Sequence, residues 1–229
     1  MSIPQQTINI DPAPAAPGDF CSANPRFSML AGPGALVAAA AGVIAARFAF
    51  ARDTDGTVSN SHTGSPSRVG FVGRNQNAFL ATIPFTAGGT VPGGYEVTLL
   101  DSADVWMLFA AGATRGQKVF ASYADGTAIA GTAGSPPTAT GVTATTATGT
   151  PNLTAVAGGT LLPGQPISGA GIPAGTTIIA VAPGTAVMSA NATASASGVA
   201  ITQTTALETA WFVDQTVNAG EIAKTSTRG

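Results

Sequence analysis

Short apolar runs separated by turn residues dominate residues 19–130. Five runs have strand length and are rich in the Val, Phe and Tyr that pleated strands favour: residues 68–73, 79–85, 95–100, 105–110 and 118–123. Turn signals lie between apolar segments at residues 53–56, 88–89, 92–94 and 125–126. This alternation predicts an all-β protein built as an antiparallel barrel or sandwich.

Residues 27–46 form an uncharged stretch of twenty positions, formally long enough to span a bilayer as a helix. Alanine favours a helix over residues 35–46, but Gly42 and the β-branched pair Val43–Ile44 oppose it. A period of two also runs into the next segment, with Ile44, Ala46, Phe48 and Phe50 on one face and Ala45, Arg47 and Ala49 on the other. The pattern favours strand, turn and strand, with no membrane span.

Residues 1–18 read as an extended N-terminal arm. Proline fixes an extended path and removes backbone donors, and few large apolar groups are present to form a core. We expect the arm to be disordered alone and to order on assembly. Its predicted partner contacts are Ile3, Ile8, Ile10, Pro12 and Pro14.

Residues 126–207 contain no charged and no aromatic side chain. Their first part, 131–150, suggests a flexible linker or a thin β-edge, while 161–202 alternate short β-runs with Pro/Gly turns. The earlier composition returns after Glu208. We therefore predict a small β-sandwich-like domain at 131–205, inserted at the Asp125–Gly126 loop tip into a domain formed by 19–130 and 206–229. The aromatic residues Trp106, Phe120, Trp211 and Phe212 are assigned to the core of that larger domain.

Charged residues make up only 9% of the chain, against about a quarter in typical soluble domains. The formal net charge is −2, and the nine basic residues are scattered, so neither nucleic acid nor an anionic membrane is an expected partner. A surface with so few charges suits a component that neighbouring subunits cover.

The residues that could carry chemistry are sparse. A single Cys21 and a single His62 exclude an internal disulfide framework and clustered thiolate or histidine metal sites, and His62 is expected to be an exposed loop residue. The carboxylate pairs, Asp53 with Asp55 and Asp101 with Asp104, fall in predicted turns. The glycine-rich run 169–175 lacks the spacing of a phosphate loop, and Pro173 removes a donor from it. We predict no catalytic, cofactor or metal site and no enzyme activity.

Several short segments together resemble head cement or decoration proteins of tailed bacteriophages. They are Gly18-Asp-Phe20, Asn24-Pro-Arg-Phe27, Arg68-Val-Gly-Phe-Val-Gly73, Gly94-Tyr-Glu-Val-Thr-Leu99, Asp104-Val-Trp106, Gly116-Gln-Lys-Val-Phe120, Ala210-Trp-Phe-Val213 and Ala219-Gly-Glu-Ile-Ala-Lys224. Residues 161–202 look like small β modules of phage surface and tail proteins. The resemblance implies a structural virion protein on the capsid exterior, made in the bacterial host cytoplasm, that stabilises the shell by bridging major capsid subunits.

Two other function classes stay open at this point. A tail or fibre adhesin would recognise host surface glycans through the inserted domain, and a virion-associated hydrolase is the third alternative. The resemblance further implies a homo-oligomer, either a trimer or a dimer. Copy number per particle separates the first two classes, because a cement protein approaches the count of the major capsid subunit whereas an adhesin is present in few copies.

Overall fold

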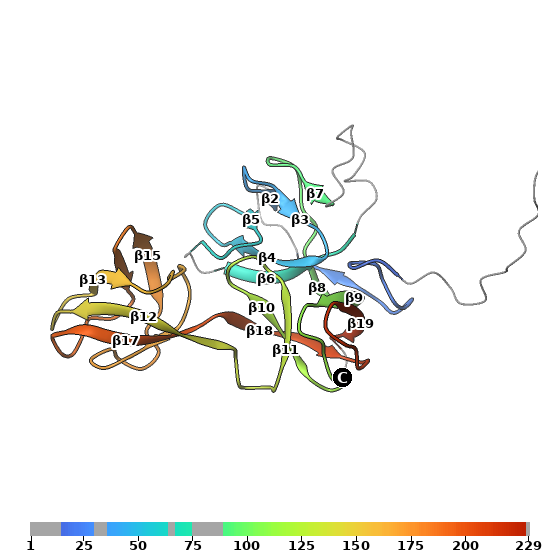
Figure 1. The fold of residues 1–229 in the computed structure, drawn as a ribbon. Helices are drawn as coiled ribbons and strands as arrows, with labels where there is room; N and C mark the ends of the chain where they lie inside the picture. The colour runs from blue at the N-terminus through green and yellow to red at the C-terminus, as the bar shows by residue number, and fades with distance from the viewer. Residues whose placement is uncertain (1–14, 30–35, 64–66, 75–88, 228–229) are drawn as a thin grey trace, which may run out of the picture.

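The computed structural model describes residues 15–29, 36–63, 67–74 and 89–227 (Figure 1). Within these ranges the chain forms strands and no α-helix, which confirms the all-β prediction. The described part also contains no helix with the length and hydropathy of a membrane span. The predicted strand at 79–85 and the proposed arm contacts Ile3, Ile8, Ile10, Pro12 and Pro14 lie outside the described residues.

Six strands form a sheet centred on β4, called the β4 sheet below. In order across the sheet they are β1 (Phe27–Ser28), β8 (Leu100–Ser102), β6 (Ser67–Val72), β4 (Arg47–Arg52), β5 (Thr57–Ser59) and β2 (Val37–Ala38). Every pair is antiparallel except β2 with β5. The predicted turn at 53–56 joins β4 to β5, and the predicted strand at 68–73 is β6.

Five antiparallel strands form a second sheet, called the β18 sheet. Their order is β11 (Ala128–Gly131), β10 (Lys118–Ser122), β18 (Ala206–Val213), β19 (Glu221–Ser226) and β9 (Asp104–Phe109). Strands β9 and β10 confirm the predictions at 105–110 and 118–123. Residues 18–21 extend this sheet beyond β9, since Gly18 N donates to Trp106 O (2.8 Å) and Phe20 bridges Val105. The last residues assigned to the arm are thus held against the fold.

The main core lies between these two sheets, as in a sandwich. Phe48 and Phe71 come from the β4 sheet, and Met107 and Trp211 come from the β18 sheet; all four are buried in one cluster. The ring of Phe48 meets Phe71 and Trp211 edge-on, with centroids 5.3 and 5.4 Å apart. The buried indole Nε1 of Trp211 donates to Ala103 O at 3.2 Å, so its polar atom is satisfied.

A second core covers the opposite face of β4. Ala49 and Ala51 pack there with Val43 and Val91, which belong to the two-stranded pair β3 (Val43–Ile44) and β7 (Thr90–Val91). Strand, turn and strand over the described part of 27–46 is confirmed, with no helix there. The predicted face containing Ile44 and Ala46 is wrong, because the chain turns at Ala46 (φ 61°) and leaves Ile44 36% exposed.

Two further strand predictions need correction. Residues 95–100 form a regular strand only at Leu100, since Glu96 makes one isolated bridge to Val37 and Val97 N donates to Leu36 O. Residues 131–150 are neither a linker nor an edge, because a central strand, β12 (Thr138–Thr146), lies within them. Its side chains alternate, with Val142, Ala144 and Thr146 buried.

The remaining six strands make a third sheet, called the β12 sheet. Their order is β14 (Ile167–Ser168), β17 (Ala196–Thr204), β12 (Thr138–Thr146), β13 (Asn152–Ala157), β16 (Thr185–Met188) and β15 (Ile178–Ala182). Aliphatic residues between Val142 and Ile201 form its core cluster, and no aromatic residue takes part. In Figure 1 this sheet lies to one side of the other two.

The chain reaches the β12 sheet from β11 and returns through β17, which is followed by β18 after the single residue Thr205. Thr205 N donates to Pro137 O (2.8 Å), and Tyr123 N donates to Thr205 O (3.0 Å). The predicted departure at the Asp125–Gly126 tip is wrong. That turn closes the β10–β11 hairpin and lies against β4, where Phe48 N donates to Gly126 O at 2.8 Å.

Candidate partner-binding surface

The outer face of the β18 sheet carries large apolar side chains that the main core does not use. Along β9, Met107 points into the core, whereas Trp106 is half-buried and Leu108 is 46% exposed. Leu108 pairs across the sheet with the half-buried Ile222 of β19. We call the group Trp106, Leu108, Phe212 and Ile222 the outer apolar face.

Two lysines stand beside the aromatic rings of this face. Lys118 pairs with Phe212 across strands, and its Nζ lies 3.7 Å from the ring centroid. Lys224 pairs with Trp106, and its Nζ lies 5.4 Å from that ring. Each contact contributes about 0.5–1 kcal/mol at an exposed site. Within the described part of the chain neither lysine has a carboxylate partner, so the face combines apolar area with positive charge.

Of the four aromatic residues assigned to one core, only Trp211 lies in the main core cluster. Phe120 is buried but is not part of that cluster, and Trp106 and Phe212 occupy the outer face. The period of two in β9 and β18 contained this information, because Trp106 alternates with Val105 and Met107, and Phe212 alternates with Trp211 and Val213.

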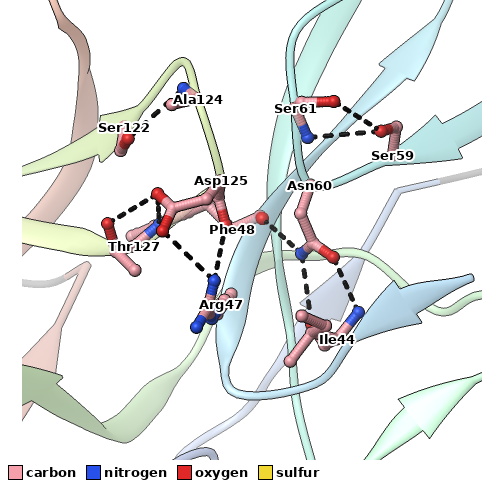
Figure 2. A network of polar contacts seen from close by, with 10 residues as sticks. All are labelled: Ile44, Arg47, Phe48, Ser59, Asn60, Ser61, Ser122, Ala124, Asp125 and Thr127. Atoms are coloured by element: carbon pink, nitrogen blue, oxygen red, sulfur yellow. Dashed lines mark hydrogen bonds and ion pairs between the residues drawn. The ribbon is translucent and has the colours of Figure 1, made fainter. Parts of the chain in front are cut away.

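A polar network ties the β10–β11 hairpin to β4 (Figure 2). The guanidinium of Arg47 lies 3.2 Å from the carboxylate of Asp125. Burial raises the pKa of Asp125, but hydrogen bonds from Thr127 and Ser122, together with the charge of Arg47, outweigh burial and hold that pKa below its usual range. The carboxylate is therefore an ionised structural group.

Asn60 forms the second half of the network (Figure 2). Its Oδ1 accepts from Ile44 N at 2.6 Å, while Nδ2 donates to Ile44 O at 3.1 Å and to Phe48 O at 2.9 Å. Asn60 is 9% exposed, so these bonds satisfy backbone groups that water does not reach well. The network holds the start of β4 in place between the two cores.

The carboxylates weighed as acid–base pairs have structural partners. Asp53 pairs with Arg68 at 3.3 Å, and Asp55 pairs with Arg52 at 3.1 Å. Hydrogen bonds from Thr57 lower the pKa of the Asp55 carboxyl. These interactions make both aspartates parts of the hairpin at the end of β4.

The two members of the second carboxylate pair, Asp101 and Asp104, also have different surroundings. Asp104 accepts hydrogen bonds from Ser22 (2.6 Å) and Asn24 (2.5 Å), which holds the segment before β1 against β9. Asp101 is exposed on β8. Among the described residues, no three His, Cys, Asp or Glu side chains gather as metal ligands would.

His62 is not the exposed loop residue that its polar sequence neighbours predicted. Its ring lies edge-on to Phe50 and Tyr123, with centroids 5.1 and 5.4 Å away, and Nδ1 is 2.8 Å from Pro163 O. Burial lowers the pKa of His62, and the bond to the Pro163 carbonyl opposes this effect in part. These contacts come from residues distant in the sequence, which is why local composition missed them.

Cys21 is partly buried beside β9. Burial raises the pKa of its thiol, and the negative charge of Asp104 raises it further. The thiolate, the reactive form, is therefore disfavoured.

The two packed sheets, the third sheet and the outer apolar face describe an all-β protein with apolar side chains exposed on one sheet. The chain belongs to the XM1 gp53 minor capsid protein family, whose sequence model matches residues 5–163. It is thus a phage structural protein that associates with capsid proteins in the virion. The matched region ends in the turn after Leu162, within the β12 sheet. A search of curated proteins finds no match.

Proposed function

We propose that this protein is a non-catalytic cement, or decoration, protein that binds the outside of the capsid and bridges adjacent major capsid subunits. The observation that carries the proposal is the outer apolar face of the β18 sheet. Leu108 of β9 is 46% exposed there, and two lysines without carboxylate partners in the described chain stand beside the aromatic rings of the same face. An exposed apolar face with positive charge beside it suits attachment to another protein's surface.

The proposed architecture has three parts. Residues 19–130 and 206–229 bind the shell, residues 131–205 are an inserted domain directed outward, and residues 1–18 include an arm that reaches neighbouring subunits through Ile3, Ile8, Ile10, Pro12 and Pro14. The separate aliphatic core of the β12 sheet supports the insertion. We further propose a homo-oligomer, with a trimer preferred to a dimer. Several copies held together would multiply the contacts with the shell.

A glycan-binding adhesin is the less favoured alternative. Sugar rings commonly pack their C–H faces on aromatic side chains, and residues 126–207 contain none. Quantifying the protein in purified particles separates the two functions. We expect a copy number approaching that of the major capsid protein, whereas a few copies per particle would support the adhesin.

A binding experiment tests the role of the outer apolar face. Leu108→Glu places a charge on that face, and Ile179→Glu is its matched control, since Ile179 is a 50% exposed strand residue of the β12 sheet. Capsids lacking the protein are mixed with each variant and sedimented. We expect Leu108→Glu to lose retention and capsid thermal stabilisation while Ile179→Glu retains both. Equal retention of the two variants would contradict the proposed surface.

The arm is tested by truncation in the same assay. Gly18 is hydrogen-bonded into the fold through Trp106 O and through Arg74 N, so the deletion ends before Ala15. We expect removal of residues 1–14 to leave the fold intact and to weaken retention through lost avidity. Unchanged retention would show that the arm does not contribute to binding.

A further inference from the structure

A cavity of about 410 Å³ lies where the segment before β1 passes over β8 and the end of β6. Phe20 and Leu100 give it apolar walls, and Gly73 lies between them. Arg26 and Arg74 line the same cavity. The cavity is separate from the outer apolar face.

The positive charge in this cavity is only partly balanced. The guanidinium carbon of Arg26 stands 3.9 Å from the centroid of the Phe20 ring, and in the described chain Arg26 forms no ion pair. Arg74 approaches Asp19 only at 3.9 Å, too far for a hydrogen bond. Asp104, the other carboxylate near this segment, accepts bonds from Ser22 and Asn24. An anion entering the cavity would find guanidinium donors that no described carboxylate holds at hydrogen-bond distance.

The shape and polarity of the cavity select among anions. A guanidinium group binds a carboxylate through two parallel N–H···O bonds, and stacking on an aromatic ring holds its plane in place. The walls formed by Phe20 and Leu100 favour a ligand with apolar atoms next to its charge. A free phosphate ion would leave these walls uncovered, whereas an acidic side chain beside an aliphatic one fills both parts. The volume falls in the range of small-ligand sites.

We propose that this cavity, the Arg26–Arg74 pocket, receives an Asp or Glu side chain and an adjacent apolar side chain from a major capsid subunit. This assignment of the occupant rests on the proposed cement function. The pocket would then set the register of the protein on the shell, since a buried charged contact fixes orientation more strictly than an apolar face does.

Two peptides of equal shape test the ligand chemistry. Acetyl-Glu-Leu-amide and acetyl-Gln-Leu-amide are titrated into the full-length protein while the backbone amide resonances of Gly73 and Thr98 are followed by NMR. We expect saturable shifts with the Glu peptide. The Gln peptide should bind at least about tenfold more weakly than the Glu peptide, because a charged hydrogen bond is replaced by a neutral one. Equal affinities, or no shift with the Glu peptide, would overturn the proposal, as would tighter binding of inorganic phosphate than of the Glu peptide.

Arginine variants connect the pocket to the peptide signal. Arg26→Gln and Arg74→Gln each remove a pocket charge, and Arg115→Gln removes an exposed charge elsewhere as the matched control. Gly73→Val keeps both charges but fills the cavity, since a Cβ there lies 3.1 Å from Leu100 Cδ1 and 3.5 Å from Phe20 Cζ. We expect all but the control to lose Glu-peptide binding. If Gly73→Val fails to fold, the surface arginine variants still decide the question. An equal loss in Arg115→Gln would indicate a general charge effect and refute the pocket.

Sedimentation with capsids separates the two proposals. If the wild type binds and Arg26→Gln with Arg74→Gln lowers retention about tenfold or more, both stand. If the wild type and this double variant bind equally, the pocket proposal fails and the cement function remains. If the wild type does not bind, the cement function fails, and with it the assignment of the pocket's occupant to the capsid.

Discussion

Gly126 of the β10–β11 hairpin packs directly against β4, so adding one methyl group there is a sharp test of the packing. Its φ is +69°, and a Cβ would lie 1.9 Å from Phe48 O and 3.2 Å from Asn60 O. Both neighbours are backbone atoms, which cannot rotate away. Gly126→Ala therefore forces the hairpin and β4 apart.

The expected cost has two parts. Placing alanine at positive φ costs about 1 kcal/mol once the smaller freedom of the unfolded chain is included. Separation of the backbones breaks the bond from Phe48 N to Gly126 O (2.8 Å) and disturbs that from Asn60 Nδ2 to Phe48 O (2.9 Å), for about 1 kcal/mol each. The free energy of unfolding should therefore fall by about 3 kcal/mol, which corresponds to a Tm decrease of about 6–12 °C at this chain length.

Gly134→Ala is the matched control, because Gly134 has φ +73° and a methyl group added there would meet nothing within 4 Å. It carries the φ cost alone, about 1 kcal/mol. Thermal unfolding followed by tryptophan fluorescence and by far-UV circular dichroism measures both variants. If the two Tm values lie within a degree of each other, the close approach of Gly126 to β4 does not contribute as reasoned.

Three further predictions concern the junction and the insertion. Asn60→Ala leaves three backbone groups without their amide partner, so urea unfolding should show a loss of about 3 kcal/mol, and a loss below about 1 kcal/mol would contradict this. Burial lowers the pKa of His62, so the contribution of this side chain to stability is complete above its ordinary pKa of about 6.5 and is lost as pH falls through the folded value. The wild type should therefore lose more stability than His62→Gln between pH 7.5 and 5. Parallel curves of stability against pH for the two proteins would refute this prediction. Replacing residues 133–204 by a short Gly/Ser linker should leave Trp211 buried, since loop-closure entropy changes slowly with length, and an exposed indole would mean that the insertion is part of one larger fold.

Local alternation predicted those strands whose two faces meet different surroundings. In β9, core-facing residues alternate with residues of the outer face, so the period of two is visible in the sequence. Strand β4 is harder to read because Phe48 and Ala49 are both buried, one in each core. Residues 142–146 alternate in the same way, but the alternation is hard to see in the sequence. Ala and Thr are small and differ little in polarity, so the buried and the outward-facing positions look alike.

Features that depend on distant segments could not be predicted from local pattern. The neighbours of His62 are Phe50, Tyr123 and Pro163, and none lies within its polar loop. The Asp125–Gly126 turn has the sequence of a solvent-exposed tip, yet β4 covers it. The Arg26–Arg74 pocket likewise arises only after β1, β6 and β8 assemble. In each case tertiary contacts decide the environment, and the sequence contains only the residue types.

The passage from β17 to β18 through Thr205 gives the molecule a direction of mechanical strength. A pull along this backbone, from the far end of the β12 sheet, acts parallel to β18 and perpendicular to its hydrogen bonds with β10 and β19. Those bonds are then loaded together in shear, so none can open before its neighbours share the load. A sideways pull would instead open the bonds one after another. A load on the β12 sheet is therefore passed along the strand into the sheet that holds Trp211, where the main core resists it.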